Sequence, residues 1–355
     1  MKSRRATSGK LRKSSLITIK EVAELANVSQ STVSRALNGH KSVKEKNRVK
    51  VFDAIEKLGY QPNAFAQALA SNKSHSIGML VGTFDGPYFG PLMHHVERVV
   101  RQKNYHLIIT SGHENYDEEQ ESIHFLNAKK IDGLVLTSDM MSDADILQIV
   151  EKTPATMLMN RYIPEISDQC ICMDNEWGGY IATEYLIKNG HTRIGCVTGQ
   201  LSKIDSRERL QGYRNALDKY GIEYDQNLVV EGRFDHDGND KAVRRLMDRD
   251  SDITGIFCLN DSIALAAYGV CHDRGMKVGE DISIVGFDNH TYSQYMTPSL
   301  TTIHFPLEDM ACEAARGVLN MLEGKPLANI NTRLFPTLMK RGSVKTLETA
   351  TIAPA

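Results

Sequence analysis

Residues 18–38, TIKEVAELANVSQSTVSRALN, restrict the fold of this chain more than any other stretch. A first short amphipathic helix is expected from four apolar residues at helical spacing: Ile19, Val22, Ala23 and Ala26. Asn27 tolerates the left-handed backbone of a tight turn, and Ser29 can cap a second helix that buries Val33 and Leu37. Two short helices joined in this way predict a helix-turn-helix that places its second helix in the major groove of DNA. The alternative is an ordinary helical hairpin.

The distribution of charge favours the DNA-binding interpretation. Residues 1–74 contain 15 Lys and Arg against 5 Asp and Glu, whereas the remaining residues contain 27 against 39, and the net charge of the whole chain is only −2. A basic head on an acidic body indicates that the head meets a polyanion and the body does not. Residues 1–17 hold six Lys and Arg and no acid, so we expect a disordered basic arm that either attracts phosphates or is a passive tail.

Residues 42–58 predict a third helix that ends at Gly59. Its expected apolar stripe is Val43, Val49, Phe52, Ile55 and Leu58. The DNA-binding domain would then span residues 18–61. Residues 62–74 follow as an alanine-rich segment that is too short for a stable helix in water, so we expect a linker that becomes helical only when it packs against something.

From residue 76 onward, apolar runs alternate with amphipathic helices, which is typical of buried parallel sheets. The expected strands are 76–82, 105–112, 132–138, 155–161, 170–175, 193–199, 228–233, 254–260 and 282–289. So many strands fit two sheets better than one. The fold class is therefore a small all-α helix-turn-helix head plus an α/β core of two doubly wound lobes over residues 75–343. We expect crossovers between the lobes near residues 174, 304 and 332, a helix over 307–323 in the first lobe, a strand over 333–339 in the second, and a tail over 344–355.

Several classes of protein find no support in the sequence. The six cysteines form no CxxC pair, no apolar run reaches membrane-spanning length, and the N-terminus lacks the apolar middle of a signal peptide, so we expect a soluble cytoplasmic protein without a membrane partner. Phosphate-binding GxGxxG and GxxxxGK[ST] loops are absent, as are GxSxG and HExxH. The adjacent His94 and His95 have no third ligand nearby in the sequence. We expect no enzyme activity, no cofactor and no metal.

Six fragments in this order carry a resemblance that extends from Thr18 to about Ser343: TIKEVAELANVSQSTVSRALN, YQPNAFAQALA, ERLQGYRNAL, CLNDSIAL, ISIVGFDN and PSLTTI. Together they resemble the LacI/GalR family of bacterial transcriptional regulators. GPYFGPL, MLMNRYIP and KNGHTRIG resemble its galactose-repressor branch most. The resemblance implies a core like the type I periplasmic binding proteins. One departure is Asn27, where the family usually has Gly, and Asn is the next-best residue for that backbone.

The resemblance assigns base reading to Gln30, Ser31 and Arg35, which agrees with the preference of Arg for guanine and of Gln for adenine. Phosphate contacts are implied for Thr18, Ser29, Thr32, Ser34, Asn38 and Tyr60. The linker maps onto the family's hinge helix, with Leu69 as a wedge in the minor groove and Asn63 and Ala66 close to it. Simple helix capping by the hydroxyls and packing of Leu69 against the core are the alternatives.

The resemblance also implies that two subunits bind a palindromic operator together. The C-terminal sequence SVKTLETATIAPA lacks a leucine heptad, so we expect a homodimer.

In the cleft between the lobes, the resemblance implies nine effector-binding residues: Tyr88, Phe89, Asn160, Asp205, Arg209, Phe234, Asn260, Asp288 and Phe305. Paired polar groups beside aromatic rings suit a neutral sugar better than a purine or an amino acid. Asn260 and Asp288 could instead be helix caps, and Arg209 a surface ion pair.

We therefore predict a DNA-binding repressor whose operator affinity is weakened by a small sugar, with galactosides and β-glucosides as first candidates. A purine- or nucleoside-responsive regulator of the same family stays open, as does a sugar-binding protein without a regulatory role.

Overall fold

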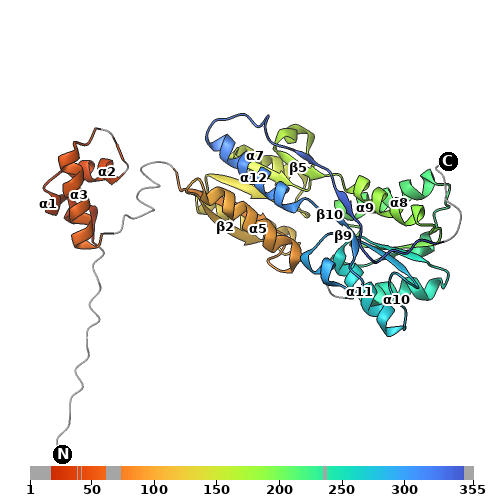
Figure 1. Cartoon of the computed structure of the whole chain (residues 1–355). Helices are drawn as coiled ribbons and strands as arrows, with labels where there is room; N and C mark the ends of the chain where they lie inside the picture. The colour runs from red at the N-terminus through yellow and green to blue at the C-terminus, as the bar shows by residue number, and fades with distance from the viewer. Residues whose placement is uncertain (1–16, 38, 41, 61–72, 235–237, 348–355) are drawn as a thin grey trace, which may run out of the picture. The chain divides into compact units, whose positions relative to one another are not determined.

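The computed structural model describes residues 17–37, 39–40, 42–60, 73–234 and 238–347. The chain separates into two compact units, residues 1–74 and residues 75–355, and each is considered by itself (Figure 1).

The described part of the first unit forms three helices, α1 (Ile19–Ala26), α2 (Gln30–Leu37) and α3 (Glu45–Leu58). The carboxylate of Glu21 accepts from the backbone N–H and the hydroxyl of Thr18, which fixes the start of α1. Asn27 ends α1 in the left-handed conformation with φ 52°, as the sequence predicts. Ser29 accepts the backbone N–H of Thr32 at 3.2 Å and so caps α2, also as predicted.

The predicted apolar stripe of the third helix is wrong at two positions. Helix α3 buries Val51 and Ala54 and half-buries Ile55 and Leu58. Val49 and Phe52 are instead about half exposed. Positions 51, 54, 55 and 58 have the spacing of one helical face. Val43 is also buried, but it lies in the turn before the helix. A stripe counted from Val43 therefore selects residues on a different face of α3. The helix ends at Gly59 with φ 62°, as predicted.

The first lobe of the second unit is built on a six-stranded sheet in the order β11-β5-β4-β3-β1-β2. Its strands are β1 (Ser76–Val81), β2 (His106–Ser111), β3 (Gly133–Leu136), β4 (Thr156–Met159), β5 (Cys170–Met173) and β11 (Arg333–Leu334). All are parallel to their neighbours. Its helices are α5 (Gly86–Arg101), α6 (Tyr116–Ala128), α7 (Asp143–Lys152) and α12 (Leu307–Leu322), with a 3-10 turn at Pro164–Gln169.

The second lobe repeats this plan with the sheet order β12-β10-β9-β8-β6-β7. Its strands are β6 (Ile194–Thr198), β7 (Val229–Glu231), β8 (Gly255–Cys258), β9 (Ser283–Asp288), β10 (Thr301–His304) and β12 (Thr337–Met339). Only β12 is antiparallel, on β10. Its helices are α8 (Asn175–Lys188), α9 (Ile204–Lys219), α10 (Asn239–Arg249) and α11 (Asp261–Asp273), with 3-10 turns at Gln226–Leu228 and Thr291–Tyr295.

The chain crosses between the lobes three times. The first crossover follows β5 at Asp174, and the second follows β10, after which α12 packs on α5, β3 and β4 of the first lobe (Figure 1). The predicted single strand over residues 333–339 is instead divided, because β11 pairs with β5 of the first sheet and β12 with β10 of the second. The third crossover therefore lies at residues 335–336, a few residues after the expected position near 332. Pro336 lacks the N–H that a continuous strand would need at this point.

Apolar side chains fill both faces of each sheet. The six cysteines are free, and all but Cys172 are buried. Among the described residues, no helix combines the length and apolarity needed to cross a membrane.

Candidate DNA-binding surface and effector cavity

Helix α2 presents a polar face made of the residues expected to read DNA. Gln30, Ser31 and Arg35 are exposed, whereas Val33 and Ala36 on the opposite face are buried. Within the described residues, no hydrogen bond or ion pair engages the side chains of Gln30 and Arg35. Both are therefore available to groups outside the protein.

Three hydroxyls cluster at the start of α2. The hydroxyl of Ser29 lies 2.8 Å from those of Ser31 and Thr32. Ser34 and Thr32 are partly buried, Thr18 is exposed at the start of α1, and Tyr60 packs against the three-helix core. Capping by Ser29 and phosphate contact are compatible because a hydroxyl can donate and accept at once. The predicted DNA contacts Asn38, Asn63, Ala66 and Leu69 lie outside the described residues, as do the linker centre and the basic arm.

A cavity of about 470 Å³ lies between the two lobes of the second unit, at the carboxyl ends of the parallel strands. Residues from both lobes line it, and all nine side chains expected at the effector site are among them: Tyr88, Phe89, Asn160, Asp205, Arg209, Phe234, Asn260, Asp288 and Phe305. The structure therefore brings together every residue of the predicted site.

The first lobe supplies an aromatic wall and an amide. The ring of Tyr88 meets Phe89 and Phe305 edge-on, at centroid distances of 5.0 and 5.5 Å. Asn160, in the left-handed conformation after β4, donates from Nδ2 to the hydroxyl of Tyr88 at 2.6 Å. The buried Oδ1 of Asn160 has no partner among the described residues. Asn160 lines the cavity, and leaving a buried acceptor unpaired is costly.

The second lobe holds Arg209 in a fixed position. Its Nε donates to Oδ1 of Asn175 at 3.0 Å, and its Nη1 donates to the carbonyl of Leu259 at 2.7 Å and to Asp288 at 3.3 Å. The guanidinium also lies over the rings of Phe287 and Phe234, 3.7 and 5.3 Å from their centroids. Arg209 is only 3% exposed, so it is not a surface ion pair.

Two carboxylates face this guanidinium. Asp288 ends β9 with the strained φ of 100° and lies 3.4 Å from Nε2 of His290. Burial opposes the charged imidazole, but the hydrogen bond with Asp288 and the nearby Asp261 raise the pKa of His290 overall. Desolvation in the cleft raises the pKa of Asp205, against the attraction of Arg209.

The side chain of Asn260 makes two hydrogen bonds to the protein backbone. Its Oδ1 accepts the backbone N–H of Ile263 at 2.8 Å and so caps α11, and its Nδ2 donates to the carbonyl of Phe234 at 3.0 Å. The cap considered in the sequence analysis is therefore present. Asn260 lines the cavity while fixing Phe234 above it.

Lys203 joins the two lobes, and the sequence analysis missed it. Its Nζ pairs with Glu114 and, at 3.3 Å, with Asp139, both in the first lobe. Coulombic attraction to Asp139 and Glu114 outweighs the desolvation of Lys203, so its pKa is raised. No local signal in GQLSKIDS marks this role, because both partners are more than sixty residues away in the sequence.

Glu119 was also missed. This carboxylate of α6 is 2% exposed and accepts from the hydroxyl of Ser138 at 2.6 Å and from the N–H of Met141 at 3.2 Å. Burial raises its pKa, although the hydrogen bonds oppose this. It ties α6 to the loop that carries Asp139, and so shapes the floor of the cavity.

Both parts of the chain match known protein families. Residues 18–63 match the description "Bacterial regulatory proteins, lacI family", and residues 183–344 match "Periplasmic binding protein-like domain". The transcriptional regulator GalR of Escherichia coli is 38% identical over 93% of this chain and 96% of its own length. The chain belongs to the LacI/GalR family. Its relatives also include the transcriptional repressor PurR of Aliivibrio salmonicida, 35% identical over 94% of this chain, and the ribose operon repressor of Escherichia coli, 34% identical over 92%.

Solved structures of family members share the fold. The lac repressor dimer bound to operator and an anti-inducer has a TM-score of 0.83 at 25% identity, covering 93% of this chain and all of that one. A transcriptional regulator CelR–cellobiose complex has a TM-score of 0.67 at 30% identity, covering 92% of this chain and 99% of that one. This LacI/GalR protein is a DNA-binding transcriptional repressor with a periplasmic-binding-like core, and its relatives are regulators and not enzymes.

Proposed function

We propose that this repressor binds a palindromic operator as a homodimer and that a neutral sugar in the interlobe cavity lowers its affinity for the operator. A galactoside or a β-glucoside is the first candidate. The observation that carries the choice of ligand is the composition of the cavity wall, in which aromatic rings stand opposite fixed hydrogen-bonding groups.

Three features favour a neutral polyol. Asn160 lines the cavity, and its amide oxygen, which has no partner among the described residues, can accept from a sugar hydroxyl once the side chain turns toward the cavity. The rings of Tyr88 and Phe305 offer apolar surface for the C–H face of a pyranose. Arg161, Lys203 and Arg209 are each paired with a carboxylate, so these three cations are already engaged and a phosphate would have to displace their partners.

The relatives support the same class of ligand. The ribose operon repressor carries the name of a sugar, and one similar structure, also a regulator, is a complex with cellobiose. PurR is almost as similar as GalR, and the same aromatic wall could stack on a purine, so purines are the second candidate.

The mechanism follows from linkage. A sugar that contacts both lobes favours one relative arrangement of them, and it changes operator affinity only through its differential preference for the arrangements that bind DNA well or badly. Dimerisation would let two linkers fold against each other on the operator, with Leu69 as the minor-groove wedge. The lac repressor structure contains a dimer on its operator, which supports this arrangement.

The test is thermal unfolding of the full chain with D-galactose, cellobiose, D-ribose, hypoxanthine and inosine. A ligand at about 100 times its dissociation constant stabilises the fold by about 2.7 kcal/mol, which is a readily measured shift in Tm. We expect a shift with a neutral sugar. A shift with hypoxanthine or inosine alone would contradict the sugar assignment while leaving the regulatory role intact.

A further inference from the structure

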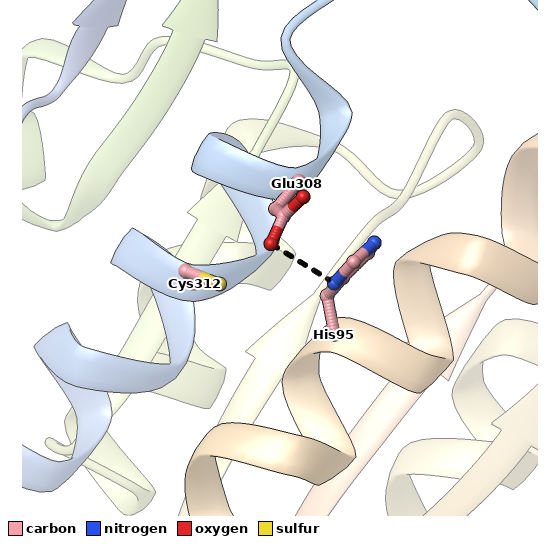
Figure 2. A group of neighbouring side chains, drawn as sticks. All are labelled: His95, Glu308 and Cys312. Atoms are coloured by element: carbon pink, nitrogen blue, oxygen red, sulfur yellow. Dashed lines mark ion pairs between the residues drawn. The ribbon is translucent and has the colours of Figure 1, made fainter.

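Three potential metal ligands meet between helices α5 and α12 of the first lobe. His95 lies on α5, and Glu308 and Cys312 lie on one face of α12 across from it (Figure 2). One ligand atom from each, a ring nitrogen, a carboxylate oxygen and a sulfur, lies within 4.8 Å of the other two. Sequence spacing could not reveal this group because more than two hundred residues separate His95 from the other two.

The fold fixes this arrangement. Glu308 and Cys312 are four residues apart, so they lie on the same face of α12 in successive turns. Helix α12 packs closely along α5, with Val96, Met310 and Ala314 buried in the same core cluster. The three donors therefore come from two rigid helices and need only side-chain adjustment to approach a common point.

The nitrogen donor of this cluster is not used by the protein itself. Nδ1 of His95 is buried, lies 3.7 Å from Oε1 of Glu308 and has no hydrogen-bond partner among the described residues. Cys312 is a free thiol, 5% exposed. A buried nitrogen without a partner carries a desolvation cost that a metal bond would remove.

The guanidinium of Arg98 already occupies the side of the cluster next to Glu308 and Cys312. Nη2 of Arg98 lies 2.6 Å from Oε1 of Glu308 and 3.7 Å from Sγ of Cys312. Its hydrogen bond lowers the pKa of Glu308. The side chain of Arg98 is 45% exposed, so it can swing into solvent without leaving a buried charge behind.

We propose that His95, Glu308 and Cys312 bind a divalent transition-metal ion of the zinc type, which displaces Arg98. A nitrogen, an oxygen and a sulfur donor suit Zn²⁺ or Co²⁺ and not Mg²⁺ or Ca²⁺, which prefer oxygen alone. Ligand atoms in a tetrahedral zinc site lie about 3.5 Å apart. A rotamer change of the exposed Glu308 closes the gap, and water takes the fourth position. Cys312 releases its thiol proton to solvent as the metal–sulfur bond forms.

The ion would join two helices that begin at the effector cavity. Tyr88 and Phe89 lie in the first turn of α5, and Phe305 lies two residues before the start of α12. A bound ion would hold these parts of the aromatic wall in one arrangement. The site itself does not depend on the proposed effector, because its ligands lie outside the residues that line the cavity.

The test is a Co²⁺ titration of the reduced full chain, followed by absorption. We expect one Co²⁺ per chain with a near-ultraviolet thiolate-to-metal charge-transfer band, and Zn²⁺ should displace it. Cys312→Ser should remove this band. His95→Gln should weaken Co²⁺ binding about tenfold or more, whereas the matched control His94→Gln, on the exposed neighbouring position, should leave it within about twofold.

Arg98→Gln separates metal binding from a structural role of the cluster. Because Arg98 competes for Glu308 and Cys312, we expect this exposed substitution to tighten Co²⁺ binding about two- to fivefold. Absence of the charge-transfer band in the wild-type chain would overturn the proposal. So would persistence of the band in Cys312→Ser, equal losses in His95→Gln and His94→Gln, or weaker binding in Arg98→Gln.

Discussion

Arg209 holds the polar wall of the cavity because its donors serve Asn175, the carbonyl of Leu259 and Asp288 together. A lysine has one ammonium group and cannot reproduce this planar geometry. We expect Arg209→Lys to abolish ligand-induced stabilisation and to lower the free energy of unfolding by about 3 kcal/mol or more, since a buried ion pair is disrupted. Urea unfolding followed by the fluorescence of Trp177, the only tryptophan, measures both effects.

Arg207→Lys is the matched control on the same helix. Arg207 is exposed, and within the described part of the chain its guanidinium donates to the backbone carbonyls of Leu201 and Ser202 alone. Its replacement should change stability by no more than about 0.5 kcal/mol. Equal losses in the two variants would contradict the role given to Arg209.

Asp261 makes stability depend on pH. Its carboxylate accepts from Thr302 at 2.6 Å and from the N–H of His290 at 2.8 Å, but burial raises its pKa to about 6. A carboxyl whose pKa is higher in the folded than in the unfolded state stabilises the fold fully below about pH 4, and this contribution is lost as the pH rises through 6.

We expect wild type to lose about 2 kcal/mol relative to Asp261→Asn between pH 4 and pH 7, because the asparagine is neutral throughout. Unfolding free energies at several pH values provide the measurement. Asp273→Asn, an exposed carboxyl on the same helix, is the control. Parallel pH profiles of wild type and Asp261→Asn would refute this prediction.

The site residues were predictable to the extent that their type and their place at strand ends determine them. Asn160 follows the last residue of β4, and Asp288 is the last residue of β9. The carboxyl ends of parallel strands are where ligands bind in α/β folds. The cap that Asn260 forms on α11 was among the sequence expectations, but its bond to the carbonyl of Phe234 and the partners of Lys203 were not predictable, because they depend on contacts made only after the lobes have folded.

At the scale of elements, local sequence patterns predicted most helices and strands. They failed where tertiary contacts determine which helix face is buried or which strands pair. Val49 and Phe52 fit an apolar stripe by composition, yet α3 turns Val51 and Ala54 toward α1 and α2. Strand β11 has only two residues, and its pairing with β5 reflects the path of the crossover and not its own propensity.

The turn between α1 and α2 is where an element boundary is most sensitive to one residue. Asn27 adopts φ 52°, which costs an alanine about 1 kcal/mol more than a glycine. We expect Asn27→Ala to reduce the protection of α1 and α2 amides from hydrogen exchange by about fivefold, and Asn27→Gly to leave it nearly unchanged. Hydrogen exchange of the full chain measures this, and equal protection in both variants would contradict it.

At the scale of the whole molecule, Lys203 links the arrangement of the lobes to the cavity. It is the second lobe's partner for Glu114 and Asp139 of the first lobe. We expect Lys203→Gln to open the lobes, to increase the radius of gyration in solution scattering, and to weaken binding of the stabilising sugar about tenfold. Lys277→Gln removes a pair with Glu280 inside one lobe and should do neither. Unchanged scattering and affinity in Lys203→Gln would contradict the linking role.

The most direct test of the account is the affinity of the full chain for its operator, with and without sugar. A palindromic operator selected in vitro by the protein would be titrated by fluorescence anisotropy, alone and with a saturating amount of the sugar that raises the Tm. The account predicts that this sugar weakens operator binding about 5- to 150-fold, the usual range of coupling between two sites. Equal operator affinity in the two titrations would contradict it.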